Sequence, residues 1–309
     1  MRIGDVGRLR AFALVADLGS ISAAASVLGY TQSAVSQQLA ALEREVGTPL
    51  VDRSQRPLRP TQAGGLLRSH VNRVLAALGS AEAAIADLRG ATERVRLAAF
   101  ASALSSFVPA AVRDVRRAHP QLALQVIQLE TDEAIERLHA GEADVAVVHH
   151  MPGAAVPETV GLRRRPLPTD HLYVVMPEGN KLARRDAVSL ADLDGKPLIL
   201  PRRDAPDGRF RSMIEHLCAE AGFAPTVAYE LDDLPAAQAF VATGIALVPM
   251  HGLILATLPP GVVARPLAEQ PLGSRAVEVL APATARTAVV EELVDRLTAT
   301  ARTHTPRQS

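Results

Sequence analysis

The segment TQSAVSQQLAALEREVG, residues 31–47, carries a run of hydrogen-bonding side chains at its start. Its apolar residues recur every three or four positions, so the spacing predicts a helix with one buried face and Thr31 as its N-cap. The candidate binding residues lie on the remaining surface of its first two turns: Gln32, Ser33, Ser36 and Gln37. Amides and hydroxyls both donate and accept hydrogen bonds, which suits the base edges of the DNA major groove. The alternative is a surface helix with a polar outer face, and the neighbouring segments decide between the two.

A basic, extended loop follows this helix. In LVDRSQRPLRP, residues 50–60, Arg53, Arg56 and Arg59 recur at every third position, and two prolines exclude a helix. Arginines on an extended loop beside a recognition helix are typical of a wing that contacts the DNA backbone or minor groove. The alternative is a solvated basic loop. Because the loop directly follows the candidate recognition helix, we favour DNA, with Thr31 and the three arginines as backbone contacts.

Two shorter helices precede the recognition helix. Periodic apolar residues predict helices over 6–18 and 22–28, and Gly29-Tyr30 forms a tight turn before the third helix. Two helices joined by such a turn form a helix-turn-helix, whose second helix lies in the major groove. We therefore expect a DNA-binding head over residues 1–60.

A long helix with a heptad pattern is expected next, over residues 61–89. Its apolar positions alternate in steps of four and three, which is the pattern of a helix–helix seam. A helix packed on its own domain would need a broader apolar stripe. We therefore expect a seam between two protomers formed by Leu67, Val71, Val74, Leu78, Ala81, Ile85 and Leu88.

The remainder of the chain, residues 90–301, alternates strand and helix patterns. Buried strand patterns such as ADVAVVHH and PLILP alternate with amphipathic helices, for example over 104–118 and 208–221. Repeated strand–helix units predict α/β layers with largely parallel sheets. A last helix is expected over 286–301, and residues 302–309 form a polar tail.

Charge and composition fit a DNA-binding head on a globular body. Residues 1–75 hold nine Arg and five Asp or Glu, which gives +4, and the rest holds 24 basic and 28 acidic residues, which gives −4. The single cysteine excludes an internal disulfide framework and fits a reducing compartment. No stretch approaches ~18 consecutive apolar residues. The charged N-terminus does not resemble a signal peptide, so we expect a cytoplasmic protein without membrane contact.

The sequence offers no pattern typical of a catalytic or metal centre. It contains no glycine-rich phosphate loop, no nucleophile elbow and no His/Cys cluster with metal spacing. Cys218 has apolar neighbours at helical spacing, which favours a core position. His149 and His150 are adjacent, so on a strand they point to opposite faces and make a poor metal pair. We expect no catalytic residues, no metal and no cofactor.

Residues 11–64, AFALVADLGSISAAASVLGYTQSAVSQQLAALEREVGTPLVDRSQRPLRPTQAG, resemble the N-terminal domain of LysR-type transcriptional regulators, nearly without gaps. One departure is Val51, where the family usually has phenylalanine, and this should weaken the packing beneath the wing. The resemblance implies an α+β multidomain protein with a winged helix-turn-helix and a linker helix that pairs two heads on a dyad-symmetric DNA site. It also implies assembly of four chains, a DNA bend that a small effector changes, and recruitment of RNA polymerase.

The body resembles the effector-binding domain of the same family, which is similar to periplasmic solute-binding proteins. The resemblance rests on GEADVAVVHH and VSLADLDGKPLILP, whereas the segment before the last strand is shortened to ATGIALVP. It implies two α/β subdomains joined by two crossing strands, with a ligand cleft between them. The first should cover about 91–164 and 267–301, and the second about 165–266.

Candidate effector-binding residues follow the carboxyl ends of the predicted strands, where open α/β folds bind ligands. They are Phe100, Ser102, Thr131, His149, Pro201 and Arg202. Ser102 and Thr131 also suit a structural role as helix caps, and Arg202 also suits a solvated position. The leading hypothesis is a DNA-binding regulator that responds to a small molecule of unknown identity. The alternative is a small-molecule-binding protein whose N-terminal domain serves assembly only.

Overall fold

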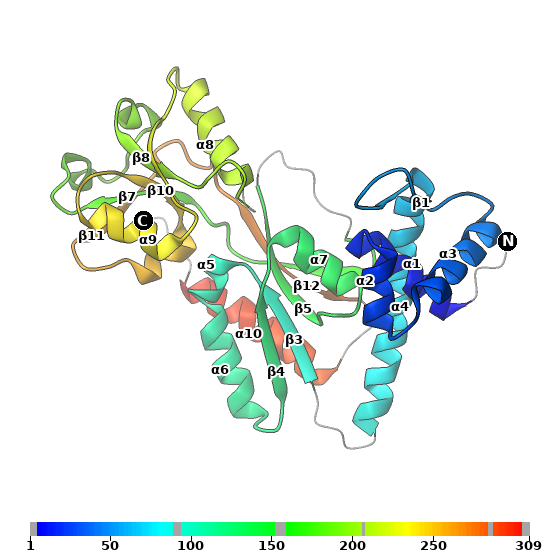
Figure 1. Ribbon diagram of the computed structural model, residues 1–309. Helices are drawn as coiled ribbons and strands as arrows, with labels where there is room; N and C mark the ends of the chain where they lie inside the picture. Colours follow the sequence, from blue (N-terminus) through cyan, green and yellow to red (C-terminus); the bar gives the residue numbers. More distant parts are fainter. Residues whose placement is uncertain (1–4, 89–93, 152–158, 206–207, 284–286, 305–309) are drawn as a thin grey trace. The chain divides into compact units, whose positions relative to one another are not determined.

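The computed structural model describes residues 5–88, 94–151, 159–205, 208–283 and 287–304 (Figure 1). The chain divides into two compact units, Met1–Ala91 with Glu136–Ala143 and Thr92–Ile135 with Asp144–Ser309. The first contains the N-terminal head and the long helix, and the second forms the body. None of the described helices is long and apolar enough to cross a membrane.

Three helices form the head, and each begins at a side-chain cap. They are α1 (Val6–Leu18), α2 (Ile21–Leu28) and α3 (Gln32–Val46). Asp5, Ser20 and Thr31 accept hydrogen bonds from backbone N–H groups in the first turns of these helices, in that order. A wing follows α3, with strands β1 (Val51–Asp52) and β2 (Arg59–Pro60) paired antiparallel. The predicted winged helix-turn-helix is confirmed.

The head has its own core, which extends beneath the wing. Phe12 and Leu39 are fully buried, and Leu50 and Val51 belong to the same cluster. Val51, at the position where the family usually has phenylalanine, is 3% exposed and so lies within this core. The Glu43 carboxylate accepts hydrogen bonds from the backbone N–H groups of Leu50 and Val51 at 2.9 and 3.3 Å, which ties the wing to α3.

The long helix α4 (Gln62–Leu88) packs on the head along its first turns. Val71 is 2% exposed within the head core, and Leu67 packs against that core. The prediction that Val71 lies in a seam between protomers is therefore wrong, because its side chain is already buried in its own head. The later apolar positions are exposed: Val74, Leu78, Ala81 and Ile85. The side chain of Leu88 lies outside the described residues.

One half of the body is a five-stranded sheet with its helices (Figure 1). The strands lie in the order β4-β3-β5-β12-β6, namely Ala123–Gln128, Arg94–Ala99, Val145–His150, Ala276–Pro282 and Leu162–Pro166. Helices α6 (Val108–Ala118) and α10 (Ala288–His304) form one core with side chains from β3, β5 and β12. Helices α5 (Ala101–Leu104) and α7 (Thr131–His139) follow β3 and β4 along the chain.

The other half contains two smaller sheets. Strand β7 (Leu172–Pro177) lies between β10 (Val248–His251) and β11 (Val262–Pro266) and is antiparallel to both. Strands β8 (Pro197–Leu200) and β9 (Thr226–Glu230) pair in parallel. The helices are α8 (Gly208–Glu220), α9 (Leu234–Ala242) and three short 3-10 helices, η1 (Lys181–Arg184), η2 (Leu190–Leu193) and η3 (Gly252–Thr257).

The structure corrects three details of the predicted body. The sheets are not largely parallel, because β12 returns from the other half and runs antiparallel to β5 and β6, and β7 is antiparallel to both of its neighbours. The helix expected over 104–118 is interrupted, since α5 ends at Leu104 and α6 begins at Val108 with Pro109 in its first turn, where a missing N–H is tolerated. Helix α10 continues to His304 rather than ending at 301.

Two chain segments connect the halves of the body, one after β6 and one before β12. Strand β6 runs through Pro166, so the expected boundary between 164 and 165 falls inside this strand. Asp170 and Arg275, one from each segment, form an isolated antiparallel bridge with backbone hydrogen bonds of 3.0 and 2.9 Å. Their side chains are 1% and 5% exposed and form an ion pair, so the crossing is joined by both backbone and side chain.

Gly64 offers a test of the head packing, with the next residue as a control. A Cβ atom at Gly64 would overlap the carbonyl oxygen of Leu50, whereas a Cβ at Gly65 meets nothing within 4 Å. Gly64→Ala should therefore lower the free energy of unfolding of the head by about 1–3 kcal/mol. Gly65→Ala should be neutral or stabilising by up to about 1 kcal/mol, because alanine has the higher helix propensity. Denaturation followed by circular dichroism measures both, and two equally stable variants would contradict this packing.

Candidate functional site

The candidate base contacts lie at the start of α3, and a neighbouring helix holds one of them. Gln32, Ser33 and Gln37 are exposed, and Ser36 is half-buried. The Nε2 atom of Gln32 donates a hydrogen bond to the Oγ atom of Ser22 on α2 at 2.8 Å. The amide keeps a second N–H and a carbonyl oxygen, so it can still donate and accept toward a base. Sequence reasoning missed Ser22, because only the angle between α2 and α3 brings it beside Gln32.

The wing presents two exposed arginines and a third that is paired within the head. Arg56 and Arg59 are exposed. Arg53 is half-exposed, and its Nη2 atom lies 3.1 Å from the Oε2 atom of Glu43. Since Arg53 would have to leave this ion pair to reach a phosphate, the geometry favours the other two arginines as backbone contacts.

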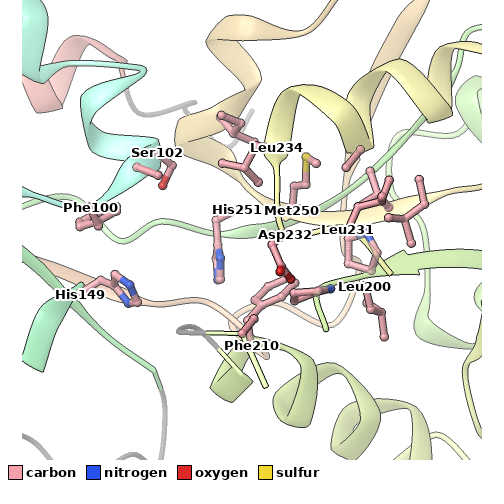
Figure 2. Close-up of a pocket in the computed structure, with 18 of the residues that line it drawn as sticks. Phe100, Ser102, His149, Leu200, Phe210, Leu231, Asp232, Leu234, Met250 and His251 are labelled. Atoms are coloured by element: carbon pink, nitrogen blue, oxygen red, sulfur yellow. The ribbon is translucent and has the colours of Figure 1, made fainter. Parts of the chain in front are cut away.

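A cavity of about 290 Å³ lies between the two halves of the body (Figure 2). Most of its polar lining comes from the five-stranded half and the connecting segments: Ser102, Gln128, Glu130, His149 and Arg275. The other half contributes a mainly apolar lining that includes Leu200, Phe210, Leu231, Leu234 and Met250. Pockets with apolar walls and a few placed polar groups are typical of small-molecule sites. The cavity therefore suits a small ligand with one polar and one apolar end.

Arg275 organises the polar wall. Its Nε atom donates to the Oδ2 atom of Asp170 at 2.9 Å, and its Nη2 atom donates to the Oγ atom of Ser102 at 2.5 Å. Its guanidinium carbon lies 4.7 Å from the ring centre of Phe100. Asp170 also accepts a hydrogen bond from the backbone N–H of Leu253 at 3.0 Å. One buried arginine thus belongs both to the crossing between the halves and to the lining of the cavity.

His149 is the last residue but one of β5, and a threonine on α7 holds its backbone. The hydroxyl of Thr131 donates to the carbonyl oxygen of His149 at 2.9 Å and accepts from its backbone N–H at 3.1 Å. The His149 ring meets Phe100 edge-on with centroids 4.8 Å apart, and its Nε2 atom lies 3.6 Å from the Oε2 atom of Glu130. Burial, and then the charge of Arg275, lower the pKa of His149 below its usual value, which favours the neutral ring.

His251 is the second buried histidine of the cavity. Its Nε2 atom lies 2.9 Å from the carbonyl oxygen of Gly273, so this nitrogen carries the hydrogen and donates it. Its ring contacts Phe210 with centroids 5.2 Å apart. Burial, and then the charge of Arg275, lower the pKa of His251 well below its usual value. In the neutral ring the Nδ1 atom is an acceptor.

Four of the six candidate effector residues line the cavity: Phe100, Ser102, His149 and Pro201. Thr131 is not part of the lining, but its hydrogen bond to the backbone of His149 holds that lining residue in place. Arg202 is not part of the lining either, because its Nε atom donates to the Oδ2 atom of Asp232 at 2.7 Å and its side chain is half-exposed. Asp232 itself lines the cavity.

Two important residues of the lining were missing from the sequence candidates. Glu130 directly follows the strand pattern LALQVIQL and could have been found by the rule that selected Thr131. Arg275 lies in a segment without periodic pattern, and only its pairing with Asp170 brings it to the cavity. The shortened segment ATGIALVP still builds part of the wall, since Val248 and the nearby Met250 line the cavity.

Cys218 is a core residue, as expected. It is fully buried in α8, and burial raises the pKa of its thiol to about 11. Within the part of the chain that the structure describes, no group of three or more His, Cys, Asp or Glu side chains is arranged to hold a metal ion.

The two histidines of the cavity predict that stability depends on pH. His149 and His251 have folded-state pKa values below the usual 6.5, so the unfolded chain binds protons more readily as the pH falls. Their contribution is complete above about pH 6.5 and is lost progressively below it. The unfolding temperature of the body should therefore drop between about pH 7 and pH 5. Calorimetry of a His149→Gln/His251→Gln variant should show a smaller drop, and an unchanged drop would contradict this assignment.

Comparison with known proteins matches both parts of the chain. The model described as "Bacterial regulatory helix-turn-helix protein, lysR family" matches residues 6–65, and the LysR substrate binding domain matches residues 88–302. The HTH-type transcriptional regulator CbbR of Xanthobacter flavus is 31% identical over 241 residues, which cover 78% of this chain and 70% of that protein. The regulator ShiR of Corynebacterium glutamicum is 30% identical over 266 residues, covering 85% and 88%.

Solved structures of full-length regulators share the fold. A full-length OxyR variant of Pseudomonas aeruginosa gives a TM-score of 0.67 at 21% identity, with all of both chains covered. Full-length CbnR in complex with its target DNA gives a TM-score of 0.56 at 22% identity, covering 96% of this chain and 100% of that one. With two family models that together span most of the sequence, this chain belongs to the LysR family of ligand-responsive, DNA-binding transcriptional regulators.

Proposed function

We propose that this LysR-family regulator reads a dyad-symmetric DNA site with α3 and the wing of two paired heads. The observation that carries this proposal is the exposed set of Gln32, Ser33 and Gln37 on the first turns of α3, followed by a basic wing. Base contacts from α3 supply specificity, and phosphate contacts from Arg56 and Arg59 supply salt-dependent affinity. Because the proposed partner is DNA, we expect the protein to act in the cytoplasm.

The heads pair through the exposed part of α4. Val74, Leu78 and Ile85 are 45%, 36% and 53% exposed, and together with Ala81 they follow heptad spacing along one face. Exposed apolar side chains in such a stripe favour a partner helix, and a two-fold pair presents two α3 helices to two half-sites. Assembly of four chains and recruitment of RNA polymerase extend the same proposal.

A small effector binds in the cavity of the body and changes the DNA complex. The two walls of the cavity come from halves that are connected by only two segments. A ligand that contacts both walls binds more tightly when they are close, so it shifts the population toward that arrangement. If the open and closed arrangements of the two walls differ in how four bodies assemble, ligand binding also changes the spacing of the heads and the DNA bend.

The response is to a reversibly bound ligand rather than to oxidation of a thiol. One relative, of Mycobacterium avium, is named a probable hydrogen peroxide-inducible genes activator and is 34% identical over 202 residues, covering 63% of this chain and 61% of that protein. The 309 residues contain one cysteine, so no disulfide can form within them. This residue, Cys218, is buried, and the pKa of its thiol is raised to about 11. A protonated, inaccessible thiol reacts slowly with oxidants.

The alternative is a small-molecule-binding protein whose N-terminal domain serves assembly only. A gel shift with DNA from the region upstream of the chain's own gene distinguishes the two. A regulator should give a discrete complex that survives an excess of random competitor DNA. If random competitor DNA abolishes the shifted band completely, only the small-molecule-binding alternative remains.

Removal of the Gln32 amide should relax base preference. Gln32→Ala should cost about 1–3 kcal/mol on the cognate site and reduce discrimination at one base pair. Ser22→Ala should act in the same direction but less, because it removes the partner that orients the amide. Ser26→Ala, at another exposed serine of α2, is the control. Fluorescence anisotropy measures affinity, and equal weakening on cognate and random DNA would reject the base contact.

A charge in the exposed stripe of α4 should prevent pairing. Leu78→Glu would place two like charges against each other without a partner, so the assembly state and then the DNA affinity should fall. Leu66→Glu is the matched control, since Leu66 is also exposed but lies on a different face of α4 at 3.6 residues per turn. Analytical ultracentrifugation gives the mass. A Leu78→Glu chain with wild-type mass would show that this stripe is not the seam.

A further inference from the structure

We infer that the ligand of the cavity is a small zwitterion with an apolar side chain, of the chemical class of the apolar α-amino acids. This inference rests on the effector role proposed for the cavity and adds the chemistry of its occupant. It follows from three features of the lining: two hydrogen-bond donors, the balance of charges, and the apolar wall.

Two donors meet at one end of the cavity. The Ser102 hydroxyl accepts a hydrogen bond from Arg275, so its own hydrogen points elsewhere and can be donated to a ligand. Arg275 uses Nε and Nη2 on Asp170 and Ser102, and its Nη1 atom has no acceptor among the described residues. Both side chains line the cavity. A hydroxyl and a guanidinium N–H side by side suit a carboxylate, which accepts charge-assisted hydrogen bonds.

The charges of the lining do not suit a ligand that is only an anion. Three charged residues line the cavity, Glu130, Asp232 and Arg275. The positive charge of Arg275 is balanced by Asp170, and the negative charge of Asp232 is balanced by Arg202. Glu130 remains, since its neighbour His149 is held in the neutral form by burial. The lining thus carries an excess negative charge.

The Glu130 carboxylate supplies the negative charge that a ligand cation would contact. Its side chain is 37% exposed, so its carboxylate can reach a ligand ammonium as well as the His149 ring. The edge-to-face pair of Phe100 and His149 separates Glu130 from Arg275, which lies over the Phe100 ring. An acid alone would be repelled by Glu130, and an amine alone would meet the Arg275 guanidinium. A molecule that carries both charges satisfies both ends.

The apolar wall receives the rest of the molecule. Leu200, Leu231, Leu234 and Met250 line the cavity on the side of the other half of the body, together with Asp232, whose charge is balanced by Arg202 (Figure 2). A volume of about 290 Å³ is at the small end for ligand pockets, so it fits a compact metabolite. Burial of an aliphatic or aromatic side chain against these residues supplies affinity that does not depend on charge.

Isothermal titration calorimetry of the full chain with three probes tests the class. L-leucine carries both charges, 4-methylpentanoate lacks the ammonium group, and 3-methylbutylamine lacks the carboxylate. L-leucine should bind, and each truncated probe should bind at least about tenfold more weakly, because each loses one charge-assisted contact. L-phenylalanine, with a larger side chain, tests how far the apolar wall extends. A 4-methylpentanoate that binds as tightly as L-leucine, or a chain that binds neither amino acid, would overturn the inference.

Variants locate the ammonium contact. Glu130→Gln should weaken L-leucine by about tenfold while 4-methylpentanoate binds as before or more tightly, because the repelling charge is gone. Glu133→Gln, at an exposed carboxylate of α7 outside the lining, should leave both probes unchanged. An equal loss of both probes in Glu130→Gln would overturn the ammonium assignment. The gel shift without added ligand separates this inference from the proposed function, because DNA binding persists if only the ligand class is wrong.

Discussion

The buried pair of Asp170 and Arg275 is the interaction on which the arrangement of the body depends. A buried guanidinium is tolerated only beside a carboxylate that balances it, and loss of one partner of such a pair typically costs about 3–5 kcal/mol. This pair also joins the two segments that connect the halves, through side chains and through an antiparallel backbone bridge. The same arginine holds Ser102 and covers Phe100. A change in the crossing must therefore change the polar wall of the cavity.

The two walls of the cavity give a ligand a physical means of acting. Most polar residues of the lining belong to the five-stranded half and the crossing, and the other half supplies a mainly apolar lining. A ligand gains its full contact energy only when both walls are in reach, so its binding and the angle between the halves are linked. The head needs no such adjustment, because caps, a shared core and the Glu43 carboxylate fix α3 and the wing locally.

The head was predictable because its structure is encoded in short-range patterns. The cap at Thr31 and the periodic apolar residues predict the three helices almost to the residue. The seam was predicted only in part, since a heptad cannot tell whether Val71 meets its own head or a partner helix. In the body, residues after strand ends were predictable, as Phe100 and Ser102 show. Arg275 was not, because its place depends on a pairing with Asp170, which lies 105 positions away in the chain.

Coupling between the cavity and the DNA site is the central claim, and reciprocal linkage tests it directly. Isothermal titration calorimetry would measure the dissociation constant of L-leucine for the free chain and for the chain saturated with DNA from its own upstream region. An effector that changes DNA binding must itself bind with a different affinity when DNA is present. The account predicts that the two dissociation constants differ by about fivefold or more. Measurable binding with equal constants in the two states would contradict it, since the cavity would then be a binding site without influence on the DNA complex.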